Sequence, residues 1–121
     1  MTVILIVEDD RDNREALAEG VTILGYQIVV AESGEEALRT LEQRNDVALA
    51  LCDIRLPGMG GSAFAAAARE RHPSLKVAFL TGDPRAVDDA IANGAIAMIK
   101  PYDFNILTHV IVDALERPPE R

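Results

Sequence analysis

The stretch VILIVEDD, residues 3–10, places an aliphatic run directly before Glu8, Asp9 and Asp10. A short, uninterrupted apolar run is typical of a strand that is buried on both faces, as in a parallel sheet. Acids that simply solvate the end of such a strand would be the plainest interpretation. Carboxylates this close together repel one another, however, unless a cation lies between them or one of them takes up a proton. The residues at the other strand ends decide between these interpretations.

Short apolar runs of this kind alternate with segments of helical periodicity along the whole chain. The expected strands are residues 3–7, 28–31, 47–52, 76–81 and 96–99. Five strands that alternate with helices predict a parallel sheet with helices on both faces.

Local signals mark the ends of the helices. Gly25 is expected to end the first helix and Gly94 the fourth, because glycine is favoured just after a helix. Ser33 and Glu36 match a capping box, in which each side chain binds a free backbone N–H of the other. The alanine-rich third helix should cover about 62–72, before Pro73; the fourth should begin near Pro84; and the last should cover about 103–116.

Composition narrows the class of protein. With 121 residues, of which 49 % are hydrophobic and none is Trp, we expect one domain with an aliphatic core. The net charge of −8 argues against direct binding to nucleic acid, which needs an excess of Lys and Arg. Cys52 is the only cysteine, so no internal disulfide can form, and we expect a small buried thiol in a cytoplasmic protein. We also expect no membrane span and no signal peptide.

Chemically distinctive residues follow four of the five expected strands. Ligand sites in open parallel sheets form beyond the carboxyl ends of the strands, where this chain places Glu8, Asp9, Asp53, Thr81 and Lys100. Oxygen ligands without His or Cys suit Mg²⁺ better than zinc. The hydroxyl and the ammonium offer donors to an anion such as a phosphoryl group bound to that metal. Asp53 is the candidate nucleophile, because a carboxylate can accept a phosphoryl group as an acyl phosphate.

Four motifs accompany these residues, in the order VEDD, CDIRLPGMGG, FLTG and IKP. With them, the chain resembles the receiver domain of two-component response regulators over essentially its whole length. The resemblance implies a flavodoxin-like α/β fold, (βα)5, with a doubly wound parallel five-stranded sheet in strand order 2-1-3-4-5. We expect the receiver domain at residues 1–117 and a C-terminal tail at residues 118–121.

The resemblance also implies a role for each residue of the cluster. Asp53 would be the phosphoacceptor. Thr81 and Lys100 would contact the phosphoryl group, and the Lys100–Pro101 peptide bond would be cis. The protein ligands of Mg²⁺ would be Glu8, Asp9, Asp53 and the backbone carbonyl of Arg55.

The chain departs from the receiver pattern at one switch position. Most receivers carry Tyr or Phe three residues before the Lys of strand five, and this chain has Ala97. We therefore expect the output surface to respond through backbone movement of residues 82–94, from Gly82 onward, with Tyr102 as a substitute aromatic. The combination of FLTG at residues 79–82 with the missing aromatic and KPY resembles a subset of stand-alone receivers with a Phe-Ala-Thr-Gly type motif, although Leu80 replaces its Ala. A stand-alone receiver is favoured over a piece of a longer regulator.

Arg55 and Asp83 each lie two residues beyond a site residue. Our hypothesis is that they pair across the mouth of the site. The pair would obstruct the water that hydrolyses the acyl phosphate and so lengthen its life.

The expected function is a signalling switch. A sensor histidine kinase or a histidine phosphotransfer protein would donate the phosphoryl group to Asp53 with Mg²⁺ assistance, and the modified state would bind a downstream protein differently. Such a chain assists its own phosphorylation and dephosphorylation but is not an enzyme acting on a separate substrate. A homodimer, if one forms, would use residues 84–115, where the last helix is apolar on more than one face.

Three alternatives stay open. A phosphatase with an Asp nucleophile needs a second acid two residues later, where this chain has Arg55. A flavodoxin-like nucleotide or flavin binder needs a glycine-rich phosphate loop, which does not follow the first strand. A degenerate receiver that only docks would not need Asp53, Thr81 and Lys100 intact. The sequence identifies neither the kinase nor the output partner.

Overall fold

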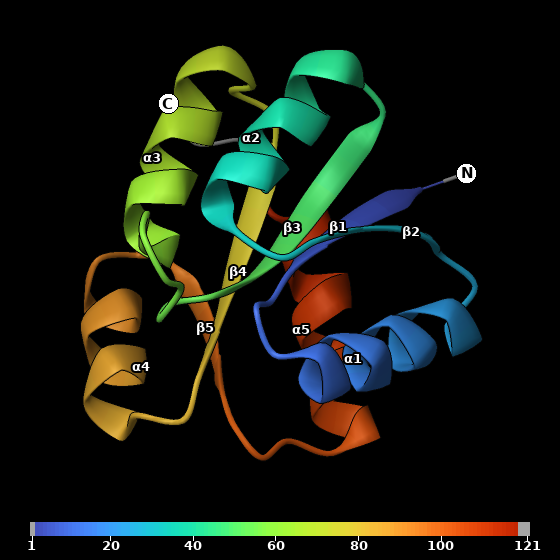
Figure 1. The fold of residues 1–121 in the computed structure, drawn as a ribbon. Helices are drawn as coiled ribbons and strands as arrows, with labels where there is room; N and C mark the ends of the chain where they lie inside the picture. Colours follow the sequence, from blue (N-terminus) through green and yellow to red (C-terminus); the bar gives the residue numbers. More distant parts are fainter. Residues whose placement is uncertain (1, 119–121) are drawn as a thin grey trace.

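The apolar runs form one parallel sheet in the computed structural model, which describes residues 2–118 (Figure 1). Its five strands are β1 (Val3–Val7), β2 (Gln27–Ala31), β3 (Val47–Asp53), β4 (Lys76–Thr81) and β5 (Ile96–Ile99). They lie in the order β2-β1-β3-β4-β5 and every neighbouring pair is parallel. The predicted flavodoxin-like architecture and strand order are confirmed.

Two layers of helices cover the sheet, one on each face (Figure 1). The helices are α1 (Arg11–Ile23), α2 (Gly34–Gln43), α3 (Gly61–Arg71), α4 (Pro84–Ala92) and α5 (Phe104–Glu116). On one face α1 and α5 pack against alternate strand residues such as Ile4 and Ile6. On the other face α2 and α3, with part of α4, pack against the intervening residues, such as Leu5 and Val7. Every residue of β1 is buried, which explains why its sequence is continuously apolar.

The helix ends follow the local signals with one difference. Gly25 and Gly94 have φ angles of 96° and 82°, in the region that favours glycine, directly after α1 and α4. The Ser33 hydroxyl accepts a hydrogen bond from the Glu36 N–H at 3.1 Å. The Glu36 carboxylate, however, accepts from the Glu32 N–H at 3.1 Å rather than from that of Ser33, so the reciprocal half of the predicted capping box is wrong by one residue.

Cys52 and Asp53 are consecutive residues of β3, so their side chains point to opposite faces of the sheet. Cys52 is fully buried in the core with α2 and α3, as predicted, and burial raises the pKa of its thiol to about 12. Asp53 is the last residue of β3 and pairs with Leu80 of β4, one residue further than the predicted strand end. Among residues 2–118, no helix is long and apolar enough to cross a membrane. Residues 119–121 of the expected tail lie outside the described residues.

Candidate functional site

Three carboxylates meet at the carboxyl end of the sheet. The Glu8 N–H donates to the Ala31 carbonyl at 3.1 Å, which continues the pairing of β1 with β2, and the Glu8 side chain is buried. Asp53 is also buried, whereas Asp9 is exposed. One carboxylate oxygen from each of the three acids lies within 4.8 Å of the other two. The strand-end acids therefore converge on one point.

Lys100 supplies a cation to the same point. Its Nζ lies 2.7 Å from Glu8 Oε1 and 2.8 Å from Asp53 Oδ2. The Lys100 N–H donates to the Thr81 carbonyl at 2.8 Å, which holds the start of the next loop against β4. The following Lys100–Pro101 peptide bond is cis, as the resemblance implies.

Burial and charge act in opposite directions on these groups. Burial raises the pKa of Glu8, and the hydrogen bond and charge of Lys100 offset this only in part. Burial alone would lower the pKa of Lys100, but the hydrogen bonds to Asp53 and Glu8 and the negative charges of both residues together outweigh burial and raise that pKa. Lys100 therefore stays charged at neutral pH. One ammonium cannot neutralise three carboxylates, and these hard oxygen donors, with no His or Cys in the cluster, fit a divalent cation such as Mg²⁺.

The opposite wall of the site comes from the ends of β3 and β4. Arg55 N–H donates to Asp53 Oδ1 at 2.9 Å and so orients the carboxylate. The buried Thr81 hydroxyl accepts from the Asp83 N–H at 3.1 Å. A hollow is lined by these four residues together with Gly82 and Pro84. The Asp53 side chain, which is 12 % exposed, borders this hollow together with Thr81 and Arg55.

Arg55 and Asp83 form the pair expected at the mouth of this hollow. Arg55 Nη2 lies 2.7 Å from Asp83 Oδ2. Asp83 is also the N-cap of α4, where its other oxygen accepts from the Arg85 N–H at 3.0 Å. The pair thus connects the loop after β3 to the first turn of α4.

Ala97, where most receivers carry the switch aromatic, and Tyr102, its expected substitute, lie on opposite faces of the sheet. Ala97 pairs with Phe79 across β4 and β5 and packs into the core beneath α3 and α4. Tyr102 packs on the other face, with α1 and α5. Its ring lies across the sheet from Ala97, so it does not fill the space beside that residue, and a switch role for Tyr102 stays a prediction.

Two residues at the start of α1 have structural roles that the sequence did not predict. Asp10, which has no role in the receiver pattern, is the N-cap of α1, and its carboxylate accepts from the Asn13 N–H at 2.9 Å. An acid directly before a helical pattern is the signal that could have shown this. Arg14 donates to backbone carbonyls of the same loop, and nothing in the sequence distinguishes it from the other basic residues.

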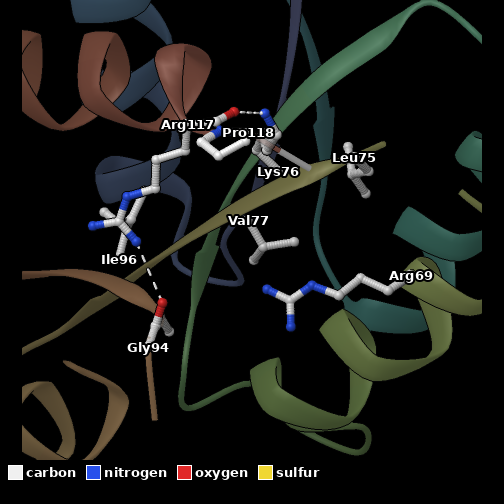
Figure 2. A pocket seen from close by; sticks show the side chains of 9 residues that line it. Arg69, Leu75, Lys76, Val77, Gly94, Ile96, Arg117 and Pro118 are labelled. Atoms are coloured by element: carbon white, nitrogen blue, oxygen red, sulfur yellow. Dashed lines mark hydrogen bonds between the residues drawn. The ribbon is translucent and has the colours of Figure 1, made fainter. Parts of the chain in front are cut away.

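A second hollow lies at the amino ends of β4 and β5, at the opposite edge of the sheet (Figure 2). Three basic side chains, those of Arg69, Lys76 and Arg117, line it beside apolar strand residues. The Lys76 ammonium donates to the Arg117 carbonyl, and the Arg117 guanidinium donates to the Gly94 carbonyl at 3.3 Å. These bonds fasten the end of α5 to β4 and to the α4–β5 loop, and no predicted site residue takes part.

Comparisons with known proteins agree with this geometry. The family model described as the response regulator receiver domain matches residues 4–112. The response regulator protein FleR of Pseudomonas aeruginosa is 33 % identical over 111 residues, which are 89 % of this chain and 23 % of FleR. A cyclic di-GMP phosphodiesterase of Thermotoga maritima is 36 % identical over 118 residues, which are 95 % of this chain and 31 % of that protein. The chain therefore spans about a quarter to a third of the length of these relatives.

Solved structures share the same fold. The receiver domain of NtrX from Brucella abortus has a TM-score of 0.86 and 29 % identity, covering 95 % of this chain and 99 % of that one. A response regulator receiver domain protein from Clostridium thermocellum has a TM-score of 0.87 at 24 % identity, covering 97 % and 96 %.

Proposed function

This chain belongs to the response regulator receiver domain family of two-component systems, and on that premise we propose that it is a phosphorylation switch whose phosphoacceptor is Asp53. The observation that carries the proposal is the convergence of Lys100 with Glu8, Asp9 and Asp53 on one accessible point. A carboxylate nucleophile, an ammonium and a cluster of hard oxygen donors together are what transfer of a phosphoryl group to an acid requires.

The transfer uses the residues in complementary ways. A free oxygen lone pair of Asp53 attacks phosphorus, the O–P bond forms, and the P–N bond of a phosphohistidine breaks as the imidazole leaves and takes up a proton. The Arg55 N–H and the Lys100 ammonium hold the Asp53 oxygens in place for this attack. Bound Mg²⁺ would neutralise charge on the phosphoryl oxygens, held by Glu8, Asp9, Asp53 and the Arg55 carbonyl.

The phosphoryl group then changes the bonding of Thr81. Its hydroxyl oxygen accepts from the Asp83 N–H, and its hydrogen can at the same time be donated to a phosphoryl oxygen. A shift of Thr81 toward the phosphoryl group pulls on Asp83 and therefore on the start of α4. None of the α4 residues is fully buried, so this helix can move at small cost, with no aromatic needed at Ala97. This is the backbone response of residues 82–94.

The Arg55–Asp83 pair governs the lifetime of the modified state. Both residues line the hollow that Asp53 also lines, so the pair would obstruct water that approaches the acyl phosphate. The phosphorylated protein is therefore a slowly hydrolysing switch rather than an enzyme that turns over a separate substrate.

The partners follow from the same chemistry. A sensor histidine kinase or a histidine phosphotransfer protein in the cytoplasm supplies the phosphoryl group, and a downstream protein reads the result. A surface within residues 84–115 is suited to binding this downstream protein or to forming a homodimer, because it exposes large apolar side chains. These are Ile91, Ile99, Phe104, Ile106 and Val112.

The test is intact mass spectrometry after incubation with acetyl phosphate or phosphoramidate, with and without Mg²⁺. We expect one Mg²⁺-dependent phosphoryl adduct on the wild-type chain and none on Asp53→Asn. An adduct that survives in Asp53→Asn would refute the assignment of the nucleophile. Absence of any adduct on folded wild-type chain with both donors would favour a receiver that only docks.

A further inference from the structure

One guanidinium joins the loop after β1 to the loop after β2. Arg14 lies in the first turn of α1, and its side chain is only 13 % exposed. Its Nη1 donates to the Glu8 carbonyl at 3.0 Å and to the Asp9 carbonyl at 3.3 Å. Its Nη2 lies 3.2 Å from the Glu32 carboxylate.

This burial distinguishes Arg14 from the other cations of the chain. Among basic side chains whose ion pairs are described within residues 2–118, Arg14 is the least exposed, followed by Lys100 at 23 %. Burying a guanidinium is costly unless its donors are engaged. Two of the acceptors here are backbone carbonyls of the very residues whose carboxylates form the acidic cluster. The side chain is therefore built into the loop that presents those acids.

A pinned carbonyl fixes the orientation of its peptide unit and so limits where the adjoining side chains can point. Mg²⁺ demands nearly ideal octahedral geometry, and groups behind the ligands commonly set their orientation. We propose that Arg14 is a positioning residue that holds the β1–α1 loop so that Glu8 and Asp9 present their carboxylates to one divalent cation. This inference rests on the proposed function and adds a determinant of its affinity for the metal.

The charge of Arg14 and its positioning role predict opposite effects of its removal on Mg²⁺ affinity. As a nearby positive charge, it repels a divalent cation, so removing that charge would tighten metal binding. As a positioning group, it lowers the freedom of the ligands, so removing it would weaken metal binding. The sign of the change therefore separates the two roles.

The experiment is a titration of the full chain with MgCl2, followed by amide chemical shifts in the β1–α1 loop. The variants are Arg14→Met, Arg14→Lys and the control Arg11→Met, which removes an exposed charge from the same helical turn. We expect Mg²⁺ affinity to fall about tenfold in Arg14→Met. It should fall severalfold in Arg14→Lys, which keeps the charge but lacks the planar fork that reaches several acceptors at once. Arg11→Met should bind within about twofold of wild type, since screened surface charges contribute little.

Equal or tighter Mg²⁺ binding in both Arg14 variants would overturn the proposal. If Arg14→Met does not fold, as judged by its amide spectrum, the charge-conserving Arg14→Lys decides the question alone. A wild-type chain that binds no Mg²⁺ would instead refute the proposed function itself. A wild-type chain that binds Mg²⁺ and takes up phosphoryl, with unaffected variants, would refute only the role of Arg14.

Discussion

Gly61 is the first residue of α3 and lies against the backbone of Asp53, the proposed phosphoacceptor. A Cβ added at Gly61 would lie 2.4 Å from the Asp53 carbonyl oxygen and 2.9 Å from Ile54 Cα. Neither atom can rotate away, and the Gly61 N–H is already bonded to the Ile54 carbonyl at 2.9 Å. To restore a contact of 3.4 Å, Gly61→Ala must move the start of α3 away from the end of β3 by about 1 Å.

This displacement should have two measurable costs. Overpacking of this kind destabilises by about 1–3 kcal/mol, which for a domain of this size lowers Tm by roughly 4–12 °C. Because the clash falls on Asp53, phosphorylation should also slow, and a misplacement of about 1 Å can cost roughly 100-fold in rate. Thermal unfolding by circular dichroism and the time course of the phosphoryl adduct measure the two effects.

The neighbouring Gly60 provides a matched control. Its added Cβ would meet only the Ile54 carbonyl oxygen, at an ordinary 3.8 Å, and its φ of −70° suits any residue. Gly60→Ala should cost less than about 1 kcal/mol, the size of a weakened N-cap. If Gly61→Ala melted within about 1 °C of Gly60→Ala and was phosphorylated as fast, the close approach would not constrain the site, and the reasoning would be refuted.

Three further predictions concern the charges and the thiol around the site. Burial raises the pKa of Glu8 above 4.5, so its contribution to stability is complete below that pH and is lost as pH rises through the folded pKa. Glu8→Gln should flatten this fall in urea unfolding of metal-free protein as pH rises above that value, and identical slopes would contradict the assignment. The Cys52 thiol is fully buried and has a pKa of about 12. It should therefore react with a thiol reagent at neutral pH only as fast as the protein unfolds, and rapid labelling of the folded chain would contradict this prediction. Arg55→Ala should shorten the half-life of the acyl phosphate on Asp53 severalfold. Because the ion pair with Asp83 is largely exposed, the substitution should change the free energy of unfolding by less than about 1 kcal/mol. An unchanged half-life would refute the shielding role of the pair.

The sequence determined the elements and the edge of the sheet at which chemistry occurs. Strands buried on both faces require continuous apolar runs, and glycines such as Gly25 and Gly94 mark helix ends by a local backbone requirement. Parallel strands bring their carboxyl ends to one edge, so the convergence of Asp53 with the acids after β1 followed from chain order alone. These inferences needed no knowledge of packing distances.

Only the tertiary structure decided which side chains from distant parts of the sequence contact one another and on which face of the sheet they pack. Lys100 reaches Glu8 and Asp53 over 92 and 47 residues, a contact whose geometry only the packed strands set. Tyr102 packs on the face away from Ala97 because the loop after β5 crosses to the layer of α1 and α5. Arg14 has no local signature, because its acceptors are backbone carbonyls that any sequence carries, and only the closed loop brings them within reach of one guanidinium.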